Sequence, residues 1–116
     1  MISVYLSGAV TSLGIESARS TFDRYERELD KASTITTVNP LDAVPFVEGK
    51  SWFYYMWNDL KVLRKCDAIA MLPNWRQSLG AKIERIFAML CGKMVFYVKD
   101  VETSDGELYA ILKPYK

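Results

Sequence analysis

Residues 66–92 read CDAIAMLPNWRQSLGAKIERIFAMLCG and contain the strand, loop and helix that decide the fold. Ala68–Leu72 is apolar at every position, which is typical of a strand covered on both faces in a parallel sheet. From Ser78 onward, apolar residues recur at steps of three and four until Gly92, and this spacing predicts a helix over 78–91. Parallel strands require such a crossover helix, so the stretch indicates an α/β protein.

The same alternation of strands and helices extends toward both ends of the chain. Further strands are predicted at Ile2–Leu6, Thr34–Val38 and Met94–Val98, and further helices at Ile15–Leu29 and Trp52–Lys65, the latter capped by Ser51. Residues 41–50 are predicted as a loop; the tail is ambiguous, and Glu107–Leu112 fits a short final helix. We therefore predict a small doubly wound, Rossmann-like parallel sheet of four to five strands with flanking helices, forming one domain over 1–116.

The composition excludes several kinds of site. Among 116 residues there is no histidine, and the two cysteines are Cys66 and Cys91, so histidine-based triads are excluded and a zinc ion would lack its usual ligands. We expect no metal and no cofactor, and proton chemistry that depends on carboxylates, tyrosines or lysines. A net charge of +1 gives no basic field for polymeric nucleic acid. Neither a membrane span nor a secretion signal is present, which predicts a cytoplasmic protein.

Ligands of open parallel sheets bind beyond the carboxyl ends of the strands. This rule selects the segments that follow the four predicted strands: Ser7–Gly14, Asn39–Lys50, Pro73–Gly80 and Lys99–Asp105. The first and third are rich in small residues and precede helix starts, where a sugar or an anion can approach the backbone. They match neither a dinucleotide-binding fingerprint nor a P-loop, and a plain tight turn explains the first of them equally well.

Glu84 is the first candidate for chemistry. It lies six residues after Ser78 in the predicted helix, and its side chain leans back toward the strand ends. We predict that Ile83, Phe87 and Leu90 form the buried stripe of this helix, with Glu84 at its border. The alternative is a surface glutamate that pairs with a neighbouring basic residue.

Asp59 and Tyr5 raise related questions. Asp59 falls close to the apolar stripe of the helix over 52–65, so it either pairs with Lys61 or Lys65 at the edge of the helix or projects into a cleft. Tyr5 ends the first strand, and if its ring is buried, its hydroxyl needs a partner, for which a glutamate is an obvious candidate.

Several segments together form a recognisable pattern. They are Tyr5-Leu6-Ser7-Gly8, Asn39-Pro40, Asn58-Asp59-Leu60, Cys66-Asp67-Ala68-Ile69 with Leu72-Pro73-Asn74-Trp75, and Ser78-Leu79-Gly80-Ala81 followed by Glu84. In this order and spacing they resemble the nucleoside 2-deoxyribosyltransferase-like superfamily, and most closely its short bacterial and viral branch. The resemblance covers residues 1–98.

The resemblance implies a Rossmann-like fold and a reaction at the N-glycosidic bond of 2-deoxynucleosides or their 5′-monophosphates. It implies that Glu84 is the nucleophile, that Tyr5 orients its carboxylate, and that Asp59 assists proton transfer to the base. The matching positions expected to bind the substrate are Ser7, Gly8, Asn39, Trp75, Ser78 and Gly80.

The resemblance is incomplete in the first loop. Relatives that act on monophosphates often carry an arginine there, whereas the stretch from Ala9 to Gly14 has no basic residue. A serine at position 78 favours a phosphate, with Lys82, Arg76 or Lys50 as substitutes for the missing arginine.

An aromatic cluster, Trp52-Phe53-Tyr54-Tyr55-Met56-Trp57, surrounds the start of one predicted helix. One helix face cannot bury all of these rings. Trp52, Tyr55 and Met56 are predicted to face the core, which leaves Phe53 and Trp57 for an interface in a homodimer or higher homo-oligomer. Alternatively, some of these rings stack on a nucleobase.

The leading hypothesis is therefore an N-glycosidase or deoxyribosyltransferase that acts on a small-molecule nucleoside or nucleotide. The first alternative is a non-catalytic protein that senses or sequesters a nucleotide in the same pocket, and the second is an interaction domain that uses the aromatic helix.

Overall fold

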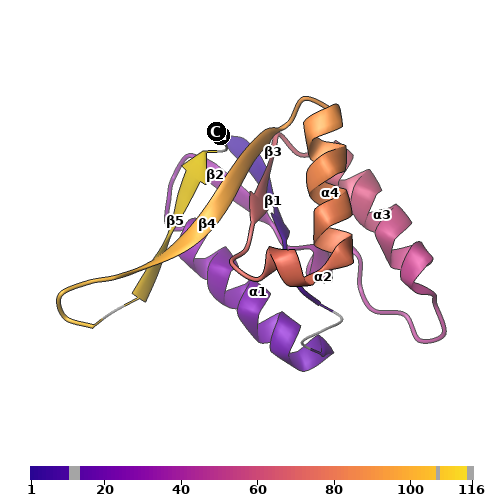
Figure 1. Ribbon diagram of the computed structural model, residues 1–116, viewed down its shortest axis with the longest axis horizontal. Helices are drawn as coiled ribbons and strands as arrows, with labels where there is room; N and C mark the ends of the chain where they lie inside the picture. Colours follow the sequence, from indigo (N-terminus) through magenta and orange to yellow (C-terminus); the bar gives the residue numbers. More distant parts are fainter. Residues whose placement is uncertain (11–13, 107, 115–116) are drawn as a thin grey trace.

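The computed structural model describes residues 1–10, 14–106 and 108–114 of the chain. The sheet contains β1 (Ile2–Ser7), β2 (Ile35–Val38), β3 (Ala68–Met71), β4 (Met94–Glu102) and β5 (Leu108–Pro114), in the order β2-β1-β3-β4-β5 (Figure 1). β1 pairs in parallel with both β2 and β3, and β3 pairs in parallel with β4. The predicted α/β fold with a mostly parallel sheet is confirmed.

The helices cover both faces of the sheet. They are α1 (Ile15–Leu29), α2 (Pro40–Ala43), α3 (Trp52–Arg64) and α4 (Leu79–Leu90), with a 3₁₀ turn, η1 (Trp75–Gln77), before α4. Alternate residues of each strand point to opposite faces. Val4, Leu6 and Ala70 therefore pack against α1, whereas Tyr5 and Ile69 pack toward α3 and α4. Helices α3 and α4 lie side by side (Figure 1).

The predicted cap at Ser51 is confirmed, and Ser78 caps α4 in the same way. Ser51 Oγ accepts the Tyr54 N–H at 3.3 Å and begins α3, and Ser78 Oγ accepts the Ala81 N–H at 3.1 Å and begins α4. Both serines satisfy a backbone donor that the first turn of a helix leaves free.

The predicted loop over 41–50 is partly wrong, because α2 starts at Pro40. Asn39 caps this short helix: its side-chain oxygen accepts the Leu41 N–H at 3.0 Å. Proline at the first helical position supplies a suitable fixed φ and lacks only a donor that would be unpaired there.

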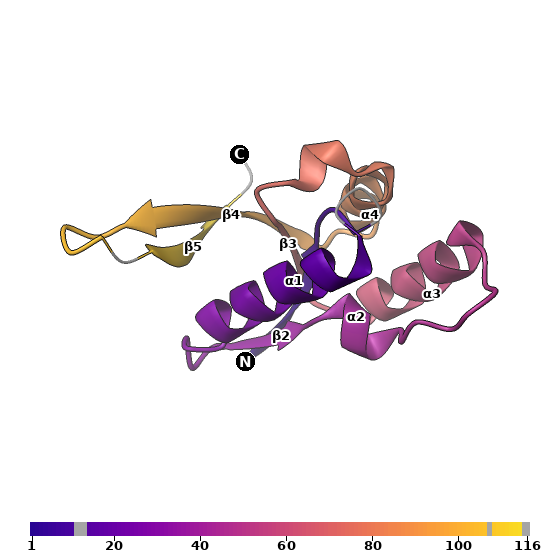
Figure 2. The ribbon, with the colours of Figure 1, turned by 90° about the horizontal axis from the view of Figure 1, so that it is seen from below.

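The tail is a strand and not the short helix that Glu107–Leu112 fits; Glu107 itself lies outside the described residues. β5 runs antiparallel to an extended β4, with Glu102 opposite Leu108 and Phe96 opposite Pro114. Ala110 and Leu112 alternate toward the α1 side of the core, so packing selects the two-residue period over the helical one. Figure 2 shows this hairpin reaching away from α3 and α4.

No helix in the described part of the chain combines the length and the apolar character needed to cross a bilayer.

Candidate functional site

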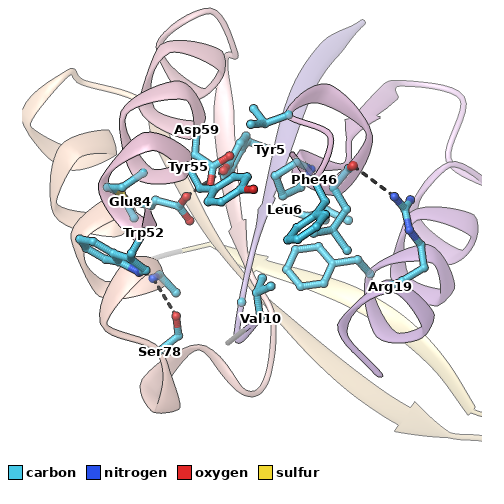
Figure 3. Close-up of a pocket in the computed structure, with 18 of the residues that line it drawn as sticks. Tyr5, Leu6, Val10, Arg19, Phe46, Trp52, Tyr55, Asp59, Ser78 and Glu84 are labelled. Atoms are coloured by element: carbon cyan, nitrogen blue, oxygen red, sulfur yellow. Dashed lines mark hydrogen bonds between the residues drawn. The ribbon is translucent and has the colours of Figure 1, made fainter. Parts of the chain in front are cut away.

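A cavity of about 410 Å³ lies beyond the carboxyl end of β1, between helices from both faces of the sheet (Figure 3). In the order β2-β1-β3, the chain turns to one side of β1 and later returns to the other, so this is the switch point at which α/β sheets bind ligands. Its wall is formed by Tyr5, Leu6, Gly8, Val10, Gly14, Arg19, Phe22, Pro40, Leu41, Val44, Phe46, Trp52, Tyr55, Met56, Asp59, Ser78, Gly80, Ala81 and Glu84.

Glu84 is buried at this cavity, with only 5% of the residue exposed. The Tyr5 hydroxyl donates to Oε2 at 2.8 Å, and the Ser7 hydroxyl donates to Oε1 at 2.6 Å. Burial raises the pKa of Glu84 from its ordinary value to about 7, and the bonds from Ser7 and Tyr5 act in the opposite direction. The alternative of a surface glutamate paired with a neighbouring base is therefore wrong.

Local sequence explains why Glu84 reaches the sheet. The buried residues of α4 are Ala81, Glu84 and Ala88, and two small side chains at helical spacing let the helix approach the strands closely. The predicted buried stripe is wrong in part, because Leu90 is 82% exposed. The helix is rotated toward its alanines, which places Glu84 on the inner face.

Tyr5 is completely buried under α3 and α4. Burial, followed by the negative charge of Glu84, holds the pKa of Tyr5 well above its usual value. The phenol therefore stays protonated and donates a hydrogen bond to Glu84.

Asp59 lines the same cavity from α3 (Figure 3). Burial, and then the charge of Glu84, raises the pKa of Asp59 to about 8. Within the described residues, Asp59 forms no ion pair with Lys61 or Lys65, so the cleft interpretation holds. Burial opposes the ionisation of both carboxyl groups, and the negative charge of Glu84 further opposes that of Asp59, so the cavity disfavours two negative charges.

Three of the residues predicted to bind substrate line the cavity: Gly8, Ser78 and Gly80. Gly8 also has a packing role, since a Cβ there would lie 2.7 Å from Asn74 Oδ1, an oxygen that accepts the Ala9 N–H at 3.0 Å. Ser7 does not line the cavity directly but holds Glu84 through its hydroxyl.

Asn39 and Trp75 are not among the lining residues. Asn39 is buried, and its amide donates to Asp23 at 2.9 Å and to Glu26 at 3.2 Å. Trp75 packs against Tyr97, with ring centroids 5.9 Å apart. In the described structure, these two side chains are occupied within the fold.

Arg19 is a lining residue that sequence analysis missed. Its guanidinium bonds to Asp42 Oδ1 at 2.5 Å, to Asp23 Oδ1 at 3.4 Å and to the Leu41 carbonyl at 3.1 Å. The helical spacing over 15–29 puts Arg19 on the polar face of α1, and no local signal in the sequence shows that α2 packs beside it. The three basic residues considered for a phosphate, Lys50, Arg76 and Lys82, are absent from the described lining.

Aromatic rings form the apolar side of the cavity. Phe46 and Tyr55 stack with an interplanar angle of 7° and centroids 6.2 Å apart. The Tyr55 hydroxyl donates to the Val47 carbonyl at 2.5 Å and accepts the Val47 N–H at 2.9 Å, which ties the segment after α2 to α3. Phe46 was missed because it falls in the predicted loop.

The carboxylates of Asp23, Glu26 and Asp42 lie within 4.8 Å of one another and are the described group that could offer ligands to a metal. Arg19 and Asn39 already donate hydrogen bonds to these carboxylates. The group is thus explained by internal pairing.

Comparisons with known proteins extend this description. The model of a family described as a domain of unknown function, DUF4406, matches residues 2–97. No match was found among curated proteins. Among solved structures, the chain is similar to the 2-deoxyribosyltransferase from Bacillus psychrosaccharolyticus, with a TM-score of 0.61 and 21% identity over 82% of this chain and 70% of that one.

A second similar structure is the 2-deoxyribosyltransferase from Leishmania mexicana. Its TM-score is 0.61 at 17% identity, over 100% of this chain and 79% of that one. The chain therefore has a nucleoside 2-deoxyribosyltransferase-like fold.

Proposed function

The chain belongs to the DUF4406 family, and we propose that it cleaves or exchanges the N-glycosidic bond of a 2-deoxynucleoside or its 5′-monophosphate, with Glu84 as nucleophile. The observation that carries this proposal is the setting of Glu84: a buried carboxylate at a cavity, with each oxygen held by one hydroxyl donor. The fold shared with two 2-deoxyribosyltransferases supports it.

In the first step, the bond between C1′ and the base nitrogen breaks, and its electron pair stays with the base. Positive charge develops at C1′, which an adjacent carboxylate stabilises and then traps as an ester. Glu84 supplies that carboxylate. Tyr5 and Ser7 are positioning residues that fix its two oxygens and disperse its charge.

Asp59 supplies the proton that the leaving base requires. Burial and the charge of Glu84 raise the pKa of Asp59 to about 8, which favours its protonated form, whereas the hydroxyl donors Tyr5 and Ser7 favour the ionised form of Glu84. This division of two carboxyl groups into an acid and a nucleophile is the general logic of glycoside cleavage.

The second step completes the reaction. Water, or a second base, attacks C1′ and loses a proton to the Asp59 carboxylate, and the ester bond to Glu84 breaks. Water gives hydrolysis, and a second base gives transfer. The stacked rings of Phe46 and Tyr55, with Trp52, offer an apolar surface for the base.

The test incubates the protein with a panel of 2-deoxynucleosides and their 5′-monophosphates and measures the released free base by chromatography. Replacing Glu84 by Gln keeps the shape of the side chain and removes the nucleophile, so we expect release to fall at least about 10³-fold. Glu48→Gln, at an exposed glutamate, is the matched control and should keep full activity. Equal release by Glu84→Gln overturns the mechanism, and tight binding without release favours the nucleotide-binding protein.

A further inference from the structure

The cavity offers little positive charge to a ligand. Three charged side chains stand among the described lining residues: Arg19, Asp59 and Glu84. Arg19 is the one cation of this described set. A phosphate monoester carries up to two negative charges near neutral pH, and anions of this kind are usually bound by arginine or lysine with donors to spare.

The charge of Arg19 is already compensated. Asp42 contacts the guanidinium at 2.5 Å and Asp23 at 3.4 Å. Glu26 lies in the same group, whose carboxylate oxygens are within 4.8 Å of one another. Arg19 thus contacts two carboxylates of a group of three, and a phosphate that approached Arg19 would also approach their negative charge.

The start of α4 adds no cation to the described lining, to which it contributes Ser78, Gly80 and Ala81. Its Ala81 N–H is bonded to the Ser78 hydroxyl at 3.1 Å, and its Lys82 N–H to the Ser78 carbonyl at 3.1 Å. Glu84 lies one turn further along the same helix and opens on the same cavity. An ionised Glu84 repels a dianion bound at this helix end.

An uncharged nucleoside meets no such repulsion. Its sugar hydroxyls can donate to carboxylate oxygens and accept from guanidinium N–H groups, and the described lining offers both kinds of partner in Asp59, Glu84 and Arg19. The cavity volume of about 410 Å³ falls in the range of small-molecule sites.

From this charge distribution we infer that the site selects the uncharged 2-deoxynucleoside over its 5′-monophosphate, and that Asp42 enforces this choice by neutralising Arg19. The inference rests on the proposed function for its substrate class and deepens it. It is the opposite of the expectation from the sequence, in which a serine at position 78 favours a phosphate.

The first measurement compares the two compounds on the wild-type protein. We expect kcat/KM for a 2-deoxynucleoside to exceed that for the matching 5′-monophosphate at least about tenfold, which corresponds to one close like-charge contact. Titration calorimetry measures the affinity for each of the same two compounds, and so shows which one binds more tightly even where no reaction occurs. If neither compound releases base but the nucleoside binds more tightly, the proposed reaction fails and the selectivity stands.

The second measurement tests the role of Asp42. Asp42→Asn removes the nearest negative partner of Arg19 with little change in shape, so relative preference should shift toward the monophosphate at least about fivefold. Asp105→Asn makes the same charge change in the β4–β5 turn and should leave the preference unchanged.

Three results would overturn the inference: a wild-type preference for the monophosphate, binding of neither compound, or an unchanged preference in a folded Asp42→Asn protein. Arg19→Gln provides a check that does not depend on the Asp42 variant. It should lower monophosphate use no more than nucleoside use, and a selective loss of monophosphate use would show that Arg19 binds phosphate.

Discussion

Two carboxyl groups at one cavity are costly to a folded protein, because burial opposes their ionisation. The pKa of Asp59 rises from 3.8 to about 8, and that of Glu84 rises from 4.5 to about 7. At a pH between the unfolded-state and folded-state pKa values of either group, the unfolded chain has lost a proton that the folded chain keeps. The free energy of unfolding is therefore highest, as far as these two groups are concerned, at low pH, and it falls as the pH rises through the folded-state pKa values.

The direction of this pH dependence gives a prediction for Asp59→Asn. Asparagine cannot ionise, so the variant should gain stability over the wild type as the pH rises from about 5 to about 8, by up to about 4 kcal/mol for three pH units at about 1.4 kcal/mol each. Urea unfolding at both pH values measures it. Asp105→Asn, at an exposed turn, should follow the wild type at both. A constant difference between Asp59→Asn and the wild type would show that Asp59 ionises normally.

Helix starts were the elements best predicted from the sequence. Ser51 and Ser78 each stand immediately before an apolar helical pattern, and each accepts a backbone N–H in the structure. The face that a helix buries was harder to predict. α4 turns its alanines inward and leaves Leu90 exposed, because close approach to the sheet favours small residues over a larger apolar stripe.

The two caps provide a matched pair of variants. Ser51→Ala and Ser78→Ala each remove one capping bond and should lower the free energy of unfolding by about 1 kcal/mol. Since Ser78 lines the cavity in the described structure and Ser51 does not, base release should fall in Ser78→Ala alone. Thermal unfolding and base release, measured on both variants, check this. Equal base release by the two variants would show that Ser78 caps α4 but does not contribute to substrate binding.

Across the whole molecule, the sequence predicted the α/β order, a cavity at the carboxyl end of the first strand and the hydrogen bond between Tyr5 and Glu84. It could not predict the partners of Arg19, because these come from Asp42 and Leu41 on an element that looked like a loop. Trp75 was expected at the substrate, yet it packs beside Tyr97. Such contacts depend on how elements that are distant in the sequence pack together, so the spacing of residues within one element cannot predict them.

The predicted interface on the aromatic helix stays a prediction. Phe53 and Trp57 are 76% and 66% exposed on α3, and Leu79, Ile86 and Leu90 are exposed on the adjacent α4. Trp52 was assigned to the core but is 37% exposed and lines the cavity. Large exposed apolar surface of this kind marks interaction sites.

We expect the wild-type chain to form a homodimer through this surface and Trp57→Glu to be monomeric at the same concentration. Sedimentation equilibrium measures both. Ser104→Glu adds the same charge in the β4–β5 turn and should remain dimeric. A monomeric wild type, or a dimer unaffected by Trp57→Glu, would place self-association elsewhere or exclude it.

The role of Glu84 is the central claim, and a trapped intermediate tests it most directly. Protein mixed with a 2-deoxynucleoside is quenched with acid within one turnover, digested and examined by mass spectrometry. We predict one 2-deoxyribosyl group on the peptide that contains Glu84, and none in Glu84→Gln. Release of base with no sugar on that peptide, or with the sugar on another residue, would contradict the account.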